Sequence, residues 1–238
     1  MGCMVEIGNL LVFLNRYKGK DDSQLSSLLE FDTKAKNRLS LRMRRIAQNY
    51  KGKETFSFLC SQEHIQLKTI QLNKKRKVQE ARSFPKFEYE DICREDWETS
   101  SVKKRFSDIF IFCIFRESVY LGAFLWQRDK RDLDGEVKQV WDKVRELVMS
   151  GNAVKEKMDK SKLNFPAEAE TRVCHIRPHG RNATDTSALP CPDQKTGLTS
   201  LPTQSFWLNH GYLNQIIEQN KKLLFRLRDK KESNENED

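Results

Sequence analysis

Residues 172–212 read RVCHIRPHGRNATDTSALPCPDQKTGLTSLPTQSFWLNHGY, and the rest of the chain is organised around them. The short apolar run at 173–176 predicts a strand, and a polar and basic segment follows it. A loop spaced by Pro and Gly then leads to the aromatic segment at 206–209, FWLN. Arg, His and Asn side chains at a strand end are those that pair with base edges and phosphates. We therefore expect this stretch to contact DNA.

Eight residues of the stretch are candidate DNA contacts because their side chains are polar, cationic or aromatic. They are Arg177, His179, Arg181, Asn182, Asp185, Thr186, Trp207 and Asn209. His175 alternates with Arg177 and His179 along the predicted strand, so these three side chains are expected to face one groove together. Packed or merely solvated histidines are the alternative.

Some of these candidates also have a structural interpretation. Trp207 is expected to pack in the core while Asn209 reaches a base. The pair Asp185 and Thr186 is expected to order the loop after the strand rather than to read a base. The reason is that an Asp carboxylate accepts a hydrogen bond only from cytosine or supports an Arg.

The composition indicates a folded protein with a basic surface. The chain has 238 residues, of which 37% are hydrophobic and 32% charged, and this suits one large domain or two lobes with a sizeable core. The 43 Lys and Arg residues outnumber the 34 Asp and Glu residues, which gives a net charge of +9. A cationic surface favours a polyanionic partner, because neutralised phosphates supply most non-specific nucleic-acid affinity. A basic protein without such a partner is the alternative.

The six cysteines include no CxxC pair, and the simplest interpretation is a reduced, cytoplasmic protein. Cys174, His175, His179 and Cys191 suggest a zinc site, but their spacing matches no standard ligand pattern, so no metal is expected there. The apolar run at 8–14 is too short to span a membrane and lacks the features of a signal peptide.

The hydrophobic pattern predicts helices and strands in a mixed order. Residues 1–17 are expected to form an apolar lead-in, for which a helix is one conformation, and residues 18–48 a pair of helices, the second starting near Thr33. Alternation over 65–72 predicts a strand, and a turn at 73–77 presents Lys74 and Lys75 as further phosphate contacts, with merely solvated lysines as the alternative.

The middle and end of the chain complete the predicted fold. Residues 83–87 are expected in a loop, 109–115 in a central buried strand because it is apolar on both faces, and 120–126 in its neighbour. The clearest helix covers 134–149 and ends at Gly151. This order predicts an α/β or α+β fold with a central mixed sheet flanked by helices. A separate helical N-terminal lobe would leave a DNA cleft.

The expected organisation has three parts. Residues 1–17 are a linker, residues 18–228 form one domain, and residues 229–238 are a charged, disordered tail.

Three motifs in this order resemble the MutH-type endonucleases, a family that includes the mismatch-repair nickase MutH and GATC-specific type II restriction enzymes. Residues 64–70, HIQLKTI, are similar to the family's strand G-V-E-L-K-T-I. Residues 176–182, IRPHGRN, match I-R-P-x-x-x-N, and residues 206–209 match F-[YW]-L-[KN]. The resemblance covers about residues 18–220 and implies a restriction-endonuclease-like fold.

The family cuts DNA with magnesium-binding carboxylates and a lysine, and this chain departs from that pattern. The Glu of the Glu-x-Lys motif is Gln66 here, while the lysine is kept as Lys68. Lys68 is expected to contact a DNA phosphate, and pairing with neighbours of Gln66 is the alternative. The Asp expected near Leu59 has no counterpart over 56–62, and Arg44 falls where a helical glutamate is expected. Losing these negative charges removes the ligands of Mg²⁺, so the sequence argues against cleavage and for binding.

Within the family, the chain resembles the non-catalytic C-terminal half of two-domain GATC restriction enzymes. The resemblance thus implies an effector domain whose main partner is double-stranded DNA. Its further expected partners are a catalytic MutH-like domain or subunit and a second copy of the same chain. The competing hypothesis is an active endonuclease whose magnesium site recruits Glu54, Glu63 or Glu80. A third hypothesis is a partner of a nuclease subunit that binds protein alone.

Overall fold

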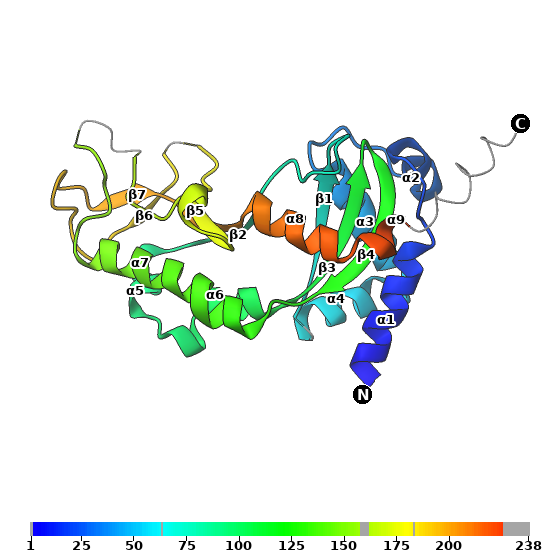
Figure 1. Cartoon of the computed structure of the whole chain (residues 1–238), viewed down its shortest axis with the longest axis horizontal. Helices are drawn as coiled ribbons and strands as arrows, with labels where there is room; N and C mark the ends of the chain where they lie inside the picture. Colours follow the sequence, from blue (N-terminus) through cyan, green and yellow to red (C-terminus); the bar gives the residue numbers. More distant parts are fainter. Residues whose placement is uncertain (1, 63, 158–161, 183, 226–238) are drawn as a thin grey trace, which may run out of the picture. The chain divides into compact units, whose positions relative to one another are not determined.

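The computed structural model describes residues 2–62, 64–157, 162–182 and 184–225. The chain forms two compact units, each built from segments that are separate in the sequence (Figure 1). Unit 1 contains residues 1–80, 108–127 and 214–238, and unit 2 contains residues 81–107 and 128–213.

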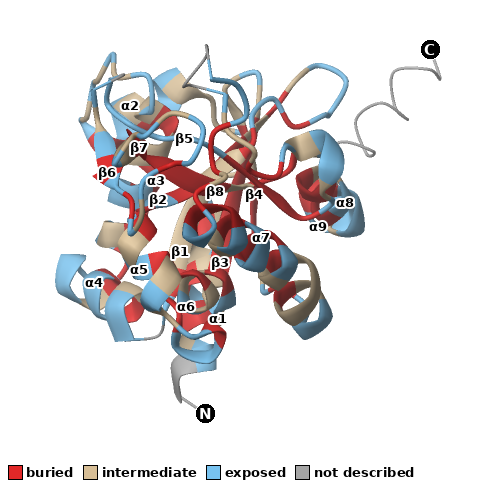
Figure 2. Cartoon of the chain, turned by 90° about the vertical axis from the view of Figure 1, so that its left-hand side faces the viewer, coloured by how far each residue is buried: buried red, intermediate tan, exposed pale blue. Residues whose placement is uncertain are grey.

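A mixed sheet is the centre of unit 1. Strand β3 (Ile109–Arg116) lies between β1 (Ile65–Leu72), which is parallel to it, and β4 (Val119–Trp126), which is antiparallel. The positions between the ends of β3 are all buried, because its sequence is apolar on both faces (Figure 2). The predicted central strand, its neighbours and the mixed α/β class are thereby confirmed, and the architecture is compatible with a restriction-endonuclease-like fold.

Four helices of unit 1 precede the sheet in the sequence. They are α1 (Gly2–Asn15), α2 (Asp22–Leu29), α3 (Arg38–Asn49) and α4 (Lys53–Gln62). Asp21 caps α2 by accepting a hydrogen bond from the Gln24 N–H. The predicted helical pair is confirmed, although α3 begins at Arg38 rather than near Thr33. Helix α4 was not predicted.

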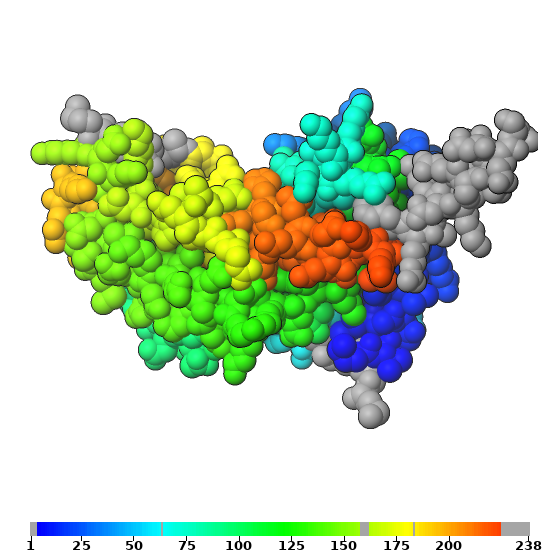
Figure 3. Space-filling model, viewed as in Figure 1, coloured from blue at the N-terminus to red at the C-terminus, as the bar shows by residue number. Residues whose placement is uncertain are grey.

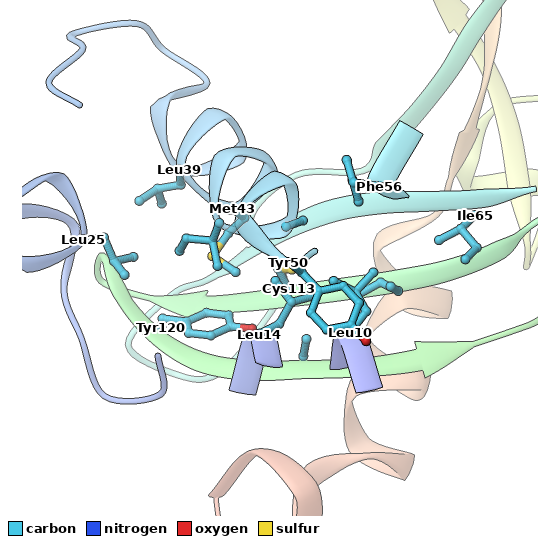
Figure 4. Packing of buried hydrophobic residues seen from close by; sticks show 14 of the residues in the cluster. Leu10, Leu14, Leu25, Leu39, Met43, Tyr50, Phe56, Ile65, Cys113 and Tyr120 are labelled. Atoms are coloured by element: carbon cyan, nitrogen blue, oxygen red, sulfur yellow. The ribbon is translucent and has the colours of Figure 1, made fainter. Parts of the chain in front are cut away.

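The N-terminal segment is part of the core and not a linker. Ile7, Leu10 and Leu14 of α1 are fully buried, and their cluster includes Met43 of α3 and Cys113 of β3 (Figure 4). Helices and sheet thus share one hydrophobic core, which corrects both the predicted lead-in over 1–17 and the separate helical lobe. The reason is that α1 is apolar at most positions and gains free energy by covering the sheet.

Unit 2 contains an antiparallel sheet with the strand order β2-β8-β5. Its strands are β2 (Arg82–Phe87), β5 (Cys174–Pro178) and β8 (Gln204–Leu208), and a second pair joins β6 (Thr186–Ala188) to β7 (Ser200–Pro202). The predicted strand before Arg177 is confirmed. The loop predicted at 83–87 is wrong, because that segment pairs with β8 through a bulge that accommodates Pro85.

Helices flank this sheet within unit 2. They are α5 (Tyr89–Arg94), α6 (Ser101–Ser107) and α7 (Lys138–Met149), with a π-helical turn, Asp132–Val137, leading into α7 and short 3₁₀ turns at Trp97–Thr99 and Glu168–Glu170. The predicted long helix is confirmed, and Gly151 follows it with φ +66°.

The described part of the chain ends in α8 (His210–Gln219), which contains the boundary between the units, and α9 (Lys221–Phe225). The tail predicted over 229–238 lies outside the described residues. No helix in the described part of the chain is long and apolar enough to cross a membrane.

Candidate nucleic-acid interface

The end of β5 presents two exposed polar residues beside one aromatic ring. Trp207 of β8 is half-buried, and its ring centroid lies 5.0 Å from the Arg177 guanidinium carbon. The His179 ring meets the same indole edge-on, with centroids 5.4 Å apart. A guanidinium and an imidazole held by one indole are restrained before a ligand arrives, so less side-chain entropy is lost on binding. The structure therefore brings Arg177, His179 and Trp207 together.

His175 and Asn209 do not belong to this exposed group, which corrects the sequence-based prediction. Both are 2% exposed, and His175 Nδ1 lies 2.6 Å from Asn209 Oδ1. The Asn209 amide donates to the backbone oxygen of Thr171 at 2.7 Å, so its polar atoms are used inside the protein. Burial lowers the pKa of His175, which favours the neutral ring. Alternation placed His175 on the same face as Arg177 correctly, but it carries no information about what covers that face.

Asp185 closes the loop that follows β5. Its carboxylate accepts the Arg181 N–H at 3.1 Å, and its backbone oxygen accepts the Thr203 N–H at 3.0 Å. The hydrogen bond from Arg181 holds the pKa of Asp185 below its usual value. Asn182 is likewise engaged, since its side-chain oxygen accepts from the Thr184 hydroxyl at 2.8 Å.

These contacts show that Asp185 orders the loop, as its position in the sequence predicted. They leave the Arg181 side chain exposed at the surface. Thr186 is exposed on β6.

The turn after β1 presents a second cationic surface, in unit 1. The Asn73 side chain accepts the Lys77 N–H at 3.0 Å, and Arg76 adopts φ +60°, so the chain reverses tightly. Lys74 and Lys75 are exposed there, and residues near 75 are coloured cyan in the surface view of Figure 3. Lys74 lies 3.6 Å from Glu117, an exposed pair that contributes little to stability.

Strand β1 carries the amide Gln66, and the carboxylate of the residue that precedes β3 lies beside it. Gln66 of β1 donates a hydrogen bond to Asp108, and His64 Nδ1 lies 3.9 Å from that carboxylate. Lys68 is half-buried two residues further along β1. The sequence analysis missed Asp108. Asp108 directly precedes β3. Because Ile109, the first residue of β3, pairs in parallel with Ile65, Asp108 lies near the start of β1 and within reach of Gln66.

The other positions expected to carry acids cannot supply them. Leu59 is buried in α4, and Arg44 is an exposed cation on α3. Glu63 lies outside the described residues. Within the described ranges, no group of three or more His, Cys, Asp or Glu residues is arranged to hold a metal ion. One carboxylate bonded to a neutral amide does not fit Mg²⁺, which needs anionic oxygen ligands.

The fold and this surface together define a mixed α/β protein with an exposed cationic and aromatic strand end. No protein-family model matches the chain. The chain is 28% identical over 223 residues to the type II restriction enzyme Sau3AI of Staphylococcus aureus, an alignment that covers 78% of this chain and 46% of that enzyme. The chain thus spans about half the length of its curated relative. This similarity supports a relationship to restriction endonucleases.

Proposed function

We propose that this chain binds double-stranded DNA at a GATC-type sequence and acts as the effector part of a type II restriction–modification system in the cytoplasm. The observation that carries the proposal is the exposed end of β5, where Arg177 and His179 rest on Trp207 beside a loop closed by Asp185. The guanidinium group of arginine can donate two hydrogen bonds to the O6 and N7 acceptors of guanine. A side chain that is already restrained in the right orientation distinguishes guanine from other bases best.

Binding without cleavage is supported by the chemistry around Gln66. The amide donates to Asp108 and brings no negative charge, while Leu59 and Arg44 stand where the family pattern expects acids. A site with a single carboxylate attracts a divalent cation weakly. The same loss of negative charge reduces repulsion of a phosphate backbone, which favours binding.

A gel-shift assay with a GATC duplex and a scrambled duplex tests this function. We expect tighter binding to the GATC duplex, and affinity that falls about 10²–10³-fold between 50 and 200 mM salt if roughly five phosphates are contacted. Equal affinity for both duplexes would exclude sequence-specific recognition, and failure to bind either duplex would exclude the function as a whole.

A magnesium-dependent GATC-specific endonuclease with a rearranged site is the second candidate. The observation that favours it is Asp108, a carboxylate that lies beside Gln66 on the sheet that also carries Lys68. This function requires Mg²⁺-dependent cutting of a plasmid with GATC sites, and loss of cutting on Lys68→Ala or Asp108→Asn. No cutting by the wild-type chain rules it out.

The proposed effector role also implies a partner. Because the relative is about twice as long as the aligned region, the partner would be a catalytic MutH-like domain or subunit, or a second copy of this chain. Titration of that subunit with and without a GATC duplex separates the possibilities. Complex formation only with DNA supports the effector role, whereas binding without DNA supports a protein-binding role.

A further inference from the structure

Strand β2 contains a bulge that changes which face Lys86 occupies. Ser83 lies opposite Trp207 and Lys86 lies opposite Ser205, with a register shift between the two pairs. Lys86 is three positions after Ser83, so in a regular strand the two side chains would point to opposite faces. Ser205 and Trp207 are two residues apart and share a face. The bulge therefore places Lys86 on the face that carries Trp207.

Lys86 forms a row across the sheet with Ser205 and Arg177. Both Lys86 of β2 and Arg177 of β5 lie directly opposite Ser205 of β8 in the register of the sheet. Neighbouring strands are about 4.8 Å apart, so the two outer backbones are separated by about 10 Å. Ser205 is fully buried, and its hydroxyl donates to the Phe84 and Pro85 backbone oxygens. The exposed side chains of Lys86 and Arg177 therefore lie on either side of the small, buried Ser205 side chain.

The contacts of Lys86 show that its charge is only loosely held. Its Nζ lies 3.5 Å from Asp185 Oδ1 and 3.9 Å from Glu88 Oε1, and its side chain is 46% exposed. Exposed pairs at such distances contribute little to stability, so the fold does not depend on them. Asp185 already accepts the Arg181 N–H and needs no lysine to order the loop. A DNA backbone phosphate carries one negative charge shared by its two non-bridging oxygens, and these can accept charge-assisted hydrogen bonds from this ammonium group.

We propose that Lys86 binds a backbone phosphate of the DNA beside the group that Arg177 contacts, and that Asp185 is the counter-charge which Lys86 contacts in the free protein and exchanges for the phosphate. This inference rests on the proposed function and assigns separate tasks to the two cations. Lys86 holds the backbone at any sequence, whereas Arg177 distinguishes the bases.

Lys86→Ala tests the assignment when its affinity is measured across a salt series with GATC and scrambled duplexes. We expect a roughly five- to tenfold loss of affinity near 0.1 M salt for both duplexes, an unchanged ratio between them and a salt slope smaller by about one. Lys86→Arg should restore the slope. Lys143→Ala is the matched control, because Lys143 is exposed to a similar degree, belongs to the same unit and pairs with Glu146 on α7.

Asp185→Asn tests the counter-charge, since the amide keeps an acceptor for the Arg181 N–H but loses the attraction for Lys86. Binding to both duplexes should become roughly two- to fivefold tighter. Weaker or unchanged binding would contradict the role of Asp185. A Lys86→Ala variant that behaves like Lys143→Ala would overturn the phosphate contact while leaving the proposed function intact. Absence of wild-type binding to either duplex would instead remove the proposed function and this inference together.

Discussion

Trp207 shows how one residue determines what its neighbours can do. Its indole is half-buried between strands, and this position allows it to support Arg177 on the exposed side. A stacked guanidinium keeps its hydrogen-bond donors directed away from the ring, whereas a free one samples many rotamers. The sequence predicted a core role for Trp207, and the structure shows a residue at the border of the core that also restrains a surface cation.

The first prediction concerns Arg177. Arg177→Ala should weaken binding to the GATC duplex by about 1–3 kcal/mol and reduce the preference over the scrambled duplex, because base contacts are lost. Arg177→Lys should recover part of the affinity but little of the preference, since an ammonium group cannot form the paired hydrogen bonds of a guanidinium. Titrations of both duplexes measure the effect. An unchanged preference in Arg177→Ala would assign Arg177 to the backbone instead.

His175 gives a prediction for the pH dependence of stability. Burial lowers its pKa in the folded state, so the unfolded chain binds the proton more readily. Stability contributed by the neutral ring is therefore present above the unfolded value of about 6.5 and is lost as the pH falls below it. His175→Gln should reduce the loss of stability between pH 7.5 and pH 5.5 by an amount on the order of 1 kcal/mol.

Denaturant unfolding at the two pH values measures this difference. The matched control is His179→Gln, which removes an exposed imidazole from the same segment and leaves the buried ring in place. If His175→Gln and the wild-type chain lose stability equally on acidification, the buried ring is not the group responsible.

Among the elements, α1 and β2 show why parts of this fold could not be predicted from sequence. Helix α1 is apolar at most positions and lacks the amphipathic pattern that marks a surface helix, so only the tertiary structure shows which side is buried. Strand β2 contains Pro85, which favours a loop when the segment is judged locally. By contrast, β1, β3, β4 and α7 have strong periodicity or uniform apolar character, and these elements were predicted correctly.

A pair of substitutions in α1 tests its place in the core. Leu10→Ala should lower the free energy of unfolding by about 2–5 kcal/mol, because Leu10 is fully buried and a cavity would remain. Val12→Ala in the same helix should change it by less than about 0.5 kcal/mol, because Val12 is 62% exposed. Chemical denaturation measures both values. If both substitutions change the free energy of unfolding by the same small amount, α1 is not part of the core and the prediction of a linker over 1–17 stands.

At the scale of the whole molecule, the division into two units was not visible in the sequence. Unit 1 takes residues from the beginning, the middle and the end of the chain, so no single change in composition marks a boundary. The position of Arg177 could be predicted, because it follows directly after the apolar run at 173–176 that forms most of β5. Asp108 and Lys86 depended on strand register and on a bulge, which local sequence patterns do not reveal.

In unit 1, several positions that the resemblance expects to be acidic carry neutral or cationic side chains, and replacing one of them gives a further prediction. Gln66→Glu would restore one acid of the family pattern, but Leu59 would remain buried in α4 and Arg44 would remain a cation on α3. The new carboxylate would also face Asp108, which now accepts a hydrogen bond from the Gln66 amide. Two carboxylates in contact raise the pKa of one of them.

A raised folded-state pKa means that the charged pair costs stability above the unfolded value of about 4.3, and that this cost disappears as the pH falls. We therefore expect Gln66→Glu to be less stable than the wild-type chain at pH 8, by an amount on the order of 1 kcal/mol, and to approach it near pH 4. It should not cut a GATC plasmid in the presence of Mg²⁺. Gln71→Glu, also half-buried on β1, is the control for adding a charge to the strand. Plasmid cutting by Gln66→Glu would show that a single substitution separates this fold from a nuclease, because the remaining ligands would then already be in place.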